Sequence, residues 1–184
     1  MKTHLIPICL PAIAITYLMS MSASVMAAEK KGSESSPPKF SSADETFMMS
    51  AAQAGMVEVK LGEIAAKKAT KPDIKEFGAM MVTDHSKANT ELKAIAAKNG
   101  VTLPSKLDAA HQEEVDKISK LSGEQFDKTY VSEMVKGHEK VAAEFEKASK
   151  TAQNLELKSF AATTLPVIKN HLKHIKAIAS GKTA

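Results

Sequence analysis

The sequence predicts an all-α protein, a bundle of four long helices with one additional short helix. Over long stretches, apolar side chains recur at three- and four-residue steps, the spacing of one face of an α-helix. No stretch shows the apolar–polar alternation that is typical of a half-buried strand. Short connections containing glycine, proline or serine separate the periodic stretches, so successive helices are expected to pack against each other.

The first 27 residues are predicted to be a secretory signal peptide that is removed from the folded protein. Lys2 precedes an apolar run, Leu5–Met19, and the small residues that follow up to Ala27 resemble a cleavage site. A membrane anchor is the alternative interpretation, but the apolar run is short and contains two prolines. We therefore expect a periplasmic or secreted mature chain without a transmembrane span, and without cysteine, since Cys9 lies in the signal peptide.

Residues 28–43 are predicted to form a flexible linker, because they are polar, rich in serine and poor in apolar side chains. Residues 44–181 are then expected to form one helical domain. Ser42 or Asp44 is a suitable N-cap for its first helix. The helices are expected at about 44–68, 72–99, 102–121, 123–150 and 154–180.

Two glycines lie beside the apolar stripe of the first helix, Gly55 and Gly62. A glycine inside a helix costs about 1 kcal/mol relative to alanine. We expect both to be there because they let a neighbouring helix approach closely.

The charges argue against nucleic acid as a partner. The formal net charge is +4, and every cationic residue is a lysine. Arginine, the preferred side chain for phosphates and base edges, is missing, and aromatic residues make up only 4% of the chain, too few for a base-stacking surface. Lysines alternate with glutamates at helical spacings, which indicates solvated helix faces. The sequence does not identify a partner. An envelope protein or another surface component is compatible with this composition.

One ionisable residue lies near the middle of the apolar stripe of each long helix: Glu58, His85, His138 and His171. Each is about 13 to 17 residues into its helix, so at a rise of 1.5 Å per residue all four lie within about one turn of a common level. Burial of ionisable groups is costly unless they pair or bind a metal. The pattern therefore predicts one buried polar cluster.

Two interpretations of this cluster are open. In the first, it is a hydrogen-bonded polar layer in a non-enzymatic binding or stress-related module, and protonation of its histidines near pH 5–6 would loosen the core. In the second, three imidazoles and one carboxylate bind a single transition-metal ion, such as zinc, iron, manganese or copper.

Other residues are weaker ligand candidates: Asp84 adjoins His85 but points about 100° away from it, His111 shares a helix face with Asp108, and His174 follows His171 by three residues. Met81 and Met134 each precede a cluster histidine by four residues, a spacing that would suit copper, although core packing explains them more simply.

Motifs of common enzymes are missing from the sequence. It contains no Gly-x-Ser-x-Gly, no glycine-rich phosphate loop and no His-Glu-x-x-His, and its mature part offers no cysteine nucleophile. The sequence therefore favours a protein that is not an enzyme.

Three pieces of the sequence together resemble a bacterial family of exported domains of unknown function (family four-one-four-two), often labelled predicted outer-membrane proteins and grouped with ferritin-like bundles. The pieces are FMMSAAQAGMVEVKLGEIAAKKATKPDIKEFGAMM from Phe47, the adjoining VTDHSKANTEL, and GEQFDKTYVSEMVKGHEKVAAEF from Gly123. The resemblance covers about Asp44 to Ala179. It implies a ferritin-like fold, export to the envelope and no assigned activity.

The sequence departs from the di-iron pattern of ferritin-like enzymes, in which a glutamate precedes each histidine ligand by three residues. The residues at that position are Val82, Val135 and Ile168, and none of them is a carboxylate. This departure argues against ferroxidase or di-iron oxygenase chemistry.

Overall fold

The computed structural model describes residues 40–182; the predicted signal peptide (1–27) and most of the predicted linker (28–43) lie outside these residues. The described chain contains five α-helices and no β-strand, which confirms the predicted fold class. The helices are α1 (Ser42–Lys68), α2 (Pro72–Lys98), α3 (Ala109–Ser119), α4 (Gly123–Thr151) and α5 (Leu155–Ala179).

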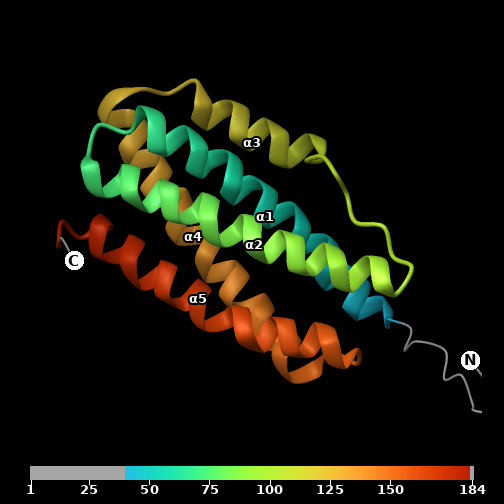
Figure 1. Cartoon of the computed structure of the whole chain (residues 1–184). Helices are drawn as coiled ribbons and strands as arrows, with labels where there is room; N and C mark the ends of the chain where they lie inside the picture. Colours follow the sequence, from blue (N-terminus) through green and yellow to red (C-terminus); the bar gives the residue numbers. More distant parts are fainter. Residues whose placement is uncertain (1–39, 183–184) are drawn as a thin grey trace, which may run out of the picture. The chain divides into compact units, whose positions relative to one another are not determined.

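The four long helices form two antiparallel hairpins, α1–α2 and α4–α5, that pack against each other (Figure 1). Contacts between the hairpins run from α1 to α4 and from α2 to α5. The short helix α3 lies on the outside, mainly against α1. Together with the segment before it, α3 carries the chain back along the bundle to the end where α4 begins (Figure 1).

The N-cap of α1 is Ser41, so the prediction of Ser42 or Asp44 as N-cap was wrong. The Ser41 hydroxyl accepts a hydrogen bond from the Asp44 backbone N–H at 3.1 Å, and the Asp44 carboxylate accepts one from the Ser41 N–H at 3.2 Å. The two residues form a capping box. Asp44 is therefore the third residue of the helix, where its charge also suits the helix dipole.

The short helix begins later than predicted, at Ala109 rather than near Thr102. Asp108 is its N-cap and accepts a hydrogen bond from the backbone N–H of His111 at 2.9 Å. Two suitable helix starts, at Pro104–Ser105 and at Asp108, follow each other here, and the later one is used.

Two buried aspartates tie the turn of each hairpin to the other hairpin. Asp44 of α1 accepts hydrogen bonds from the backbone N–H groups of Gln153 (3.1 Å) and Asn154 (3.2 Å) in the α4–α5 turn. Asp127 of α4 accepts the N–H of Thr70 (3.0 Å) in the α1–α2 turn. Because buried backbone N–H groups need hydrogen-bond partners, these contacts help to set the register of the two hairpins.

Two glycines face each other where α1 and α2 pack. A Cβ atom added at Gly62 would lie 2.7 Å from the carbonyl oxygen of Gly78, and one at Gly78 would lie 2.8 Å from that of Gly62. A Cβ at Gly55 would lie 2.0 Å from Oδ1 of Asn89. The distances at Gly62 and Gly78 are too short for real contacts with backbone, which confirms that Gly62 permits a close approach of α2, whereas Gly55 makes room for the Asn89 side chain.

Substitution of Gly62 by alanine is expected to destabilise the bundle by about 1–3 kcal/mol, because the new methyl group meets backbone that must move away. This is the net loss of stability, after the gain of about 1 kcal/mol in helix propensity has been subtracted. The matched control is Gly137→Ala, whose Cβ would meet only Glu58 Oε1 at 3.5 Å and should leave stability unchanged or improved. Urea unfolding followed by circular dichroism measures both; equal losses would contradict the packing argument.

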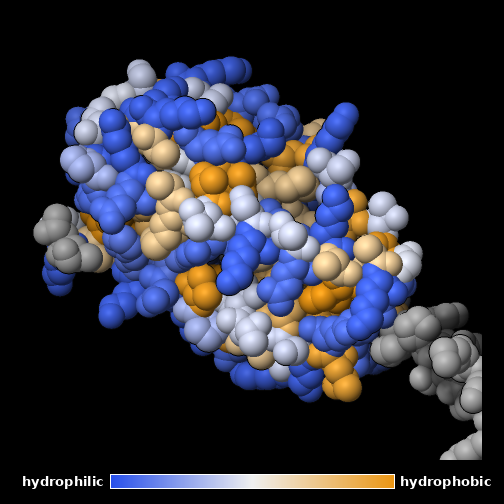
Figure 2. Space-filling model, viewed as in Figure 1, coloured by the Kyte–Doolittle hydropathy of each residue, from blue (hydrophilic) through white to orange (hydrophobic). Residues whose placement is uncertain are grey.

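The helix surfaces agree with a bundle that is solvated on its outside. Figure 2 shows a largely hydrophilic face with apolar side chains in small separate groups. Large exposed apolar residues in the described chain are Met49, Leu155 and Val167. None of the helices between residues 40 and 182 is long and apolar enough to cross a membrane.

Candidate metal centre

The buried ionisable residues lie between two separate apolar clusters of the core. One cluster contains Met48, Leu92 and Phe145, and the other contains Leu61 and Phe77, each with further apolar neighbours. In α2, α4 and α5, the predicted histidine falls between the residues of one cluster and those of the other. The core is therefore interrupted by a polar level near the middle of the helices.

Three histidines from three helices meet at this level: His85 of α2, His138 of α4 and His171 of α5. Their ring centroids are 5.7 Å (His85–His138), 5.4 Å (His85–His171) and 5.6 Å (His138–His171) apart. One ring nitrogen from each lies within 4.8 Å of the other two. The expectation that the stripes bring these residues to one level is confirmed for the histidines.

Two of the rings are held by hydrogen bonds on one side. Nδ1 of His138 donates to the backbone carbonyl oxygen of Met134 at 2.9 Å, and Nε2 of His171 donates to Oδ2 of Asp84 at 2.8 Å. Because a carbonyl or carboxylate oxygen only accepts, each donating nitrogen carries the proton in a neutral ring. The other nitrogen, Nε2 of His138 or Nδ1 of His171, then carries the lone pair. Metal-binding histidines are commonly oriented in this way.

One nitrogen of each ring is buried without a hydrogen-bond partner in the described part of the chain. These atoms are Nε2 of His85, Nε2 of His138 and Nδ1 of His171. The His85 residue is partly exposed, but its Nε2 atom is not accessible to solvent. A buried polar atom without a partner typically costs 1–3 kcal/mol. Three such atoms at one place require an explanation.

The histidines are neutral at neutral pH. Burial, together with the neighbouring imidazoles, lowers the pKa of His85 to about 3. Burial lowers the pKa of His138 to about 4, against the opposing effect of its hydrogen bond to Met134. Burial also lowers the pKa of His171, and Asp84 partly offsets this effect. Neutral imidazole is the form that binds a metal ion.

Glu58 of α1 lies beside the histidines but not among their converging nitrogens. Its side chain is buried, with Oε1 3.6 Å from Nδ1 of His138, which is the nitrogen that donates to Met134. Burial, reinforced by the charge of Glu114, raises the pKa of Glu58 to about 8. The role of Glu58 as a fourth metal ligand therefore stays a prediction.

The weaker candidates lie around the cluster. Asp84 supports His171 through the hydrogen bond described above. His174 is half-buried, and its ring lies 5.6 Å from that of Phe77. His111 lies on α3, where Nδ1 is 2.9 Å from Oδ1 of Asp108. None of the three belongs to the group of converging ligand atoms found among the described residues.

Sequence reasoning missed the supporting role of Asp84. From the sequence alone, Asp84 was only a weaker ligand candidate. The sequence did contain a signal for this role. Adjacent residues of a helix point about 100° apart, so Asp84 and His85 can contact two different neighbouring helices. Which helix Asp84 faces depends on the rotation of α2 about its own axis, and the sequence pattern defines this rotation only approximately.

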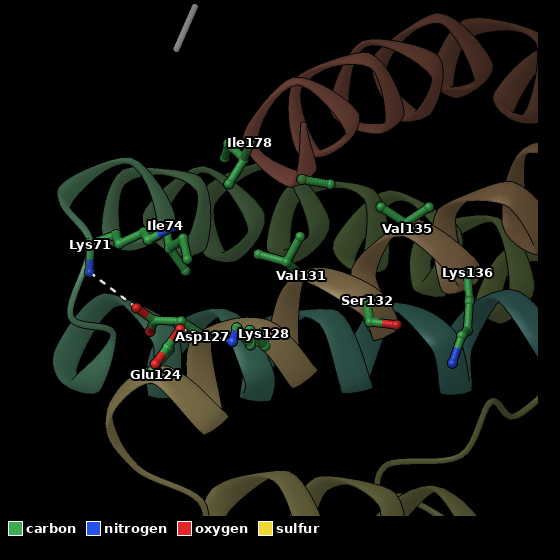
Figure 3. Close-up of a pocket in the computed structure, with 11 residues that line it drawn as sticks. Lys71, Ile74, Glu124, Asp127, Lys128, Val131, Ser132, Val135, Lys136 and Ile178 are labelled. Atoms are coloured by element: carbon green, nitrogen blue, oxygen red, sulfur yellow. Dashed lines mark hydrogen bonds and ion pairs between the residues drawn. The ribbon is translucent and has the colours of Figure 1, made fainter. Parts of the chain in front are cut away.

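A larger surface cavity of the described chain lies away from the histidines. It has a volume of about 540 Å³ and is lined by α4, the start of α2 and the end of α5. Figure 3 shows Ile74, Val131 and Ile178 around it, together with Lys71 and Asp127, which are joined by a hydrogen bond from the Lys71 N–H. No cluster histidine lines this cavity.

The comparisons with known proteins identify a family and a fold, without an activity. The chain is similar to the crystal structure of a DUF305 fragment from Deinococcus radiodurans, with a TM-score of 0.67 and 13% sequence identity over 77% of this chain and 97% of that chain. At this identity the similarity shows the fold alone. No curated protein matches the sequence.

Neither comparison places the chain in the ferritin-like superfamily that the resemblance implies. The profile of one family, described as "Domain of unknown function (DUF4142)", matches residues 29–178. Since this match spans most of the chain and the whole polar level of the bundle, the protein belongs to the DUF4142 family.

Proposed function

We propose that this protein binds one transition-metal ion through His85, His138 and His171. The observation that carries the proposal is the convergence of three neutral imidazoles whose inner nitrogens lack hydrogen-bond partners among residues 40–182. Two of the same rings donate their other N–H to a carbonyl or carboxylate oxygen. That combination supplies three buried nitrogens without partners, two of them on rings that a hydrogen bond holds from the outer side.

Three imidazoles suit zinc, copper or iron better than magnesium or calcium, which prefer oxygen ligands. Tetrahedral bonds of 2.0–2.1 Å would place the nitrogens about 3.3 Å apart. One nitrogen from each ring lies within 4.8 Å of the other two, so small inward movements of the rings would complete the site. A fourth position would be left for water or for Glu58, whose Oε2 has no partner in the described chain.

The predicted signal peptide at residues 1–27 would place this site in the periplasm or outside the cell. A cysteine-free metal site is suited to such a compartment, because no thiolate ligand can be lost to disulfide formation. We therefore propose an exported helical bundle that binds a metal ion, and we assign it no enzymatic activity.

Metal content after equilibrium dialysis tests the proposal. Untagged protein is stripped with a chelator, dialysed against zinc, copper, iron or manganese, and measured by elemental analysis. We expect one ion per chain for the wild type with at least one of these metals, and almost none for His85→Ala or His138→Ala.

His111→Gln is the matched control, because His111 is a surface histidine and should not affect the bound metal. Circular dichroism verifies that each variant is folded. A wild-type protein that stays metal-free with all four metals would overturn the proposal in favour of a polar layer without metal. A loss of metal in His111→Gln equal to that in His138→Ala would also overturn it.

A further inference from the structure

A second cavity, of about 210 Å³, lies between α1, α3 and α4 and contains several carboxylates. We call it the acidic vestibule. Its glutamates come from all three helices, and two lysines of α4 also line it. These charged residues are Glu58, Glu114, Glu133, Glu144, Lys136 and Lys140. His111 lines the vestibule as well, but its ring is paired with Asp108 and we assign it no role.

Glu58 connects the acidic vestibule with the histidines. It is only 4% exposed, and its Oε2 atom is buried without a hydrogen-bond partner within residues 40–182. Glu58 also lines a small inner cavity of about 20 Å³, and His85 lines the same cavity. On its other side, Oε1 lies 3.6 Å from Nδ1 of His138. One carboxylate therefore borders the vestibule, the inner cavity and the cluster.

The charges in the acidic vestibule are unequally compensated. Glu133 pairs with Lys136 at 2.8 Å, and Glu144 lies 4.0 Å from Lys140 and accepts a hydrogen bond from Ser50. Glu114 has no such lysine partner in the described chain, and its charge acts on the Glu58 carboxyl. Near Glu58, the potential is therefore dominated by carboxylates.

We propose that the acidic vestibule is the access route for the metal cation, and that Glu58 is the last carboxylate the cation meets before the three imidazoles. This inference rests on the proposed function. Glu114 attracts the divalent ion, Glu58 receives it, and the ion then passes to His85, His138 and His171. Fields of this kind raise the association rates of oppositely charged ligands by about 10- to 1,000-fold.

Stopped-flow mixing of cobalt(II) with the metal-free full-length protein tests the route, because the visible absorption of cobalt(II) changes when imidazoles replace its water ligands. We expect Glu114→Gln to slow association by roughly 3- to 10-fold at low salt, within the range known for steering. At about 0.5 M salt the difference should largely disappear, because screening shortens the reach of the charge. Glu58→Gln should slow association more than Glu114→Gln does.

Glu113→Gln is the matched control. Glu113 precedes Glu114 on α3 but pairs with Lys117 and does not line the vestibule. The same change of net charge should therefore leave association close to the wild-type rate. The final amount of bound cobalt(II) should be equal in the wild type, Glu113→Gln and Glu114→Gln.

The outcomes separate the two proposals. If the wild type binds cobalt(II) and Glu114→Gln associates at the same rate as Glu113→Gln, the route is wrong while the metal site stands. If the wild type shows no change in absorption and no bound cobalt(II), the metal site itself is wrong, and the route falls with it.

Discussion

Zinc is expected to raise the free energy of unfolding of the wild-type protein by about 2.7 kcal/mol when the free ion is at 100 times its dissociation constant. The physical reason is that only the folded chain holds His85, His138 and His171 together; they come from three different helices. Urea unfolding of chelator-treated protein, with and without added zinc, measures this gain. An unchanged unfolding midpoint with saturating zinc would contradict it.

The Asp84→Asn variant tests whether the hydrogen bond from His171 to the Asp84 carboxylate supports the metal site. It is a sharper test than the removal of a ligand, because all three histidines are kept. The amide can still accept from Nε2 of His171 but carries no charge, so we expect zinc affinity to fall by roughly 10- to 100-fold. Asp116→Asn, on the exposed side of α3, removes the same charge and should leave the affinity unchanged. Isothermal titration of all three proteins compares the affinities; equal values for Asp84→Asn and the wild type would show that the carboxylate gives the site no support.

The metal-free protein is expected to be most stable near pH 6.5, with losses on both sides. On the acidic side, the pKa values of His85 and His138 fall from 6.5 to about 3 and about 4 on folding. Between these values and 6.5 the unfolded chain binds more protons, so the stability present above pH 6.5 is lost as the pH falls. The acid sensitivity predicted for pH 5–6 thus begins near 6.5 and continues towards pH 4.

On the alkaline side, the decisive group is Glu58, whose pKa rises from 4.5 to about 8 on folding. Here the folded chain binds more protons, so this contribution is complete below pH 4.5 and is lost as the pH rises to 8. Between pH 4.5 and 6.5, the effect of Glu58 on the free energy of unfolding opposes that of the two histidines. Above pH 6.5, the effect of Glu58 is no longer opposed by them. With about 1.4 kcal/mol per pKa unit, we expect a loss of about 2 kcal/mol between pH 6.5 and 8.

Urea unfolding of chelator-treated protein from pH 4.5 to 8.5 checks both sides. In Glu58→Gln the alkaline loss should be missing while the acidic loss persists, because the amide does not titrate. The control is Glu63→Gln, an exposed position of the same helix, which should retain the wild-type profile. A Glu58→Gln profile identical to that of the wild type would show that Glu58 is ionised in the folded protein at neutral pH.

Much of the candidate site could be predicted because it depends on local helix geometry. The apolar stripe specifies which residues face inward, and the rise per residue specifies their height. Those two quantities bring His85, His138 and His171 to one level. The position of Glu58 was less predictable, because its Oε1 lies 3.6 Å from Nδ1 of His138, the nitrogen that donates to Met134. This placement depends on side-chain torsions and on how α1 packs.

The amino-acid sequence alone determined the all-α class, the four long helices and the buried level at which ionisable residues interrupt the core. These features follow from the helical period of apolar residues, which is a property of local sequence. Only the tertiary structure decided that Asp84 supports His171, that α3 begins at Ala109, and that Glu58 faces a vestibule shared with Glu114. Such contacts join residues distant in sequence, and they depend on the rotation and separation of whole helices, which many side chains set together.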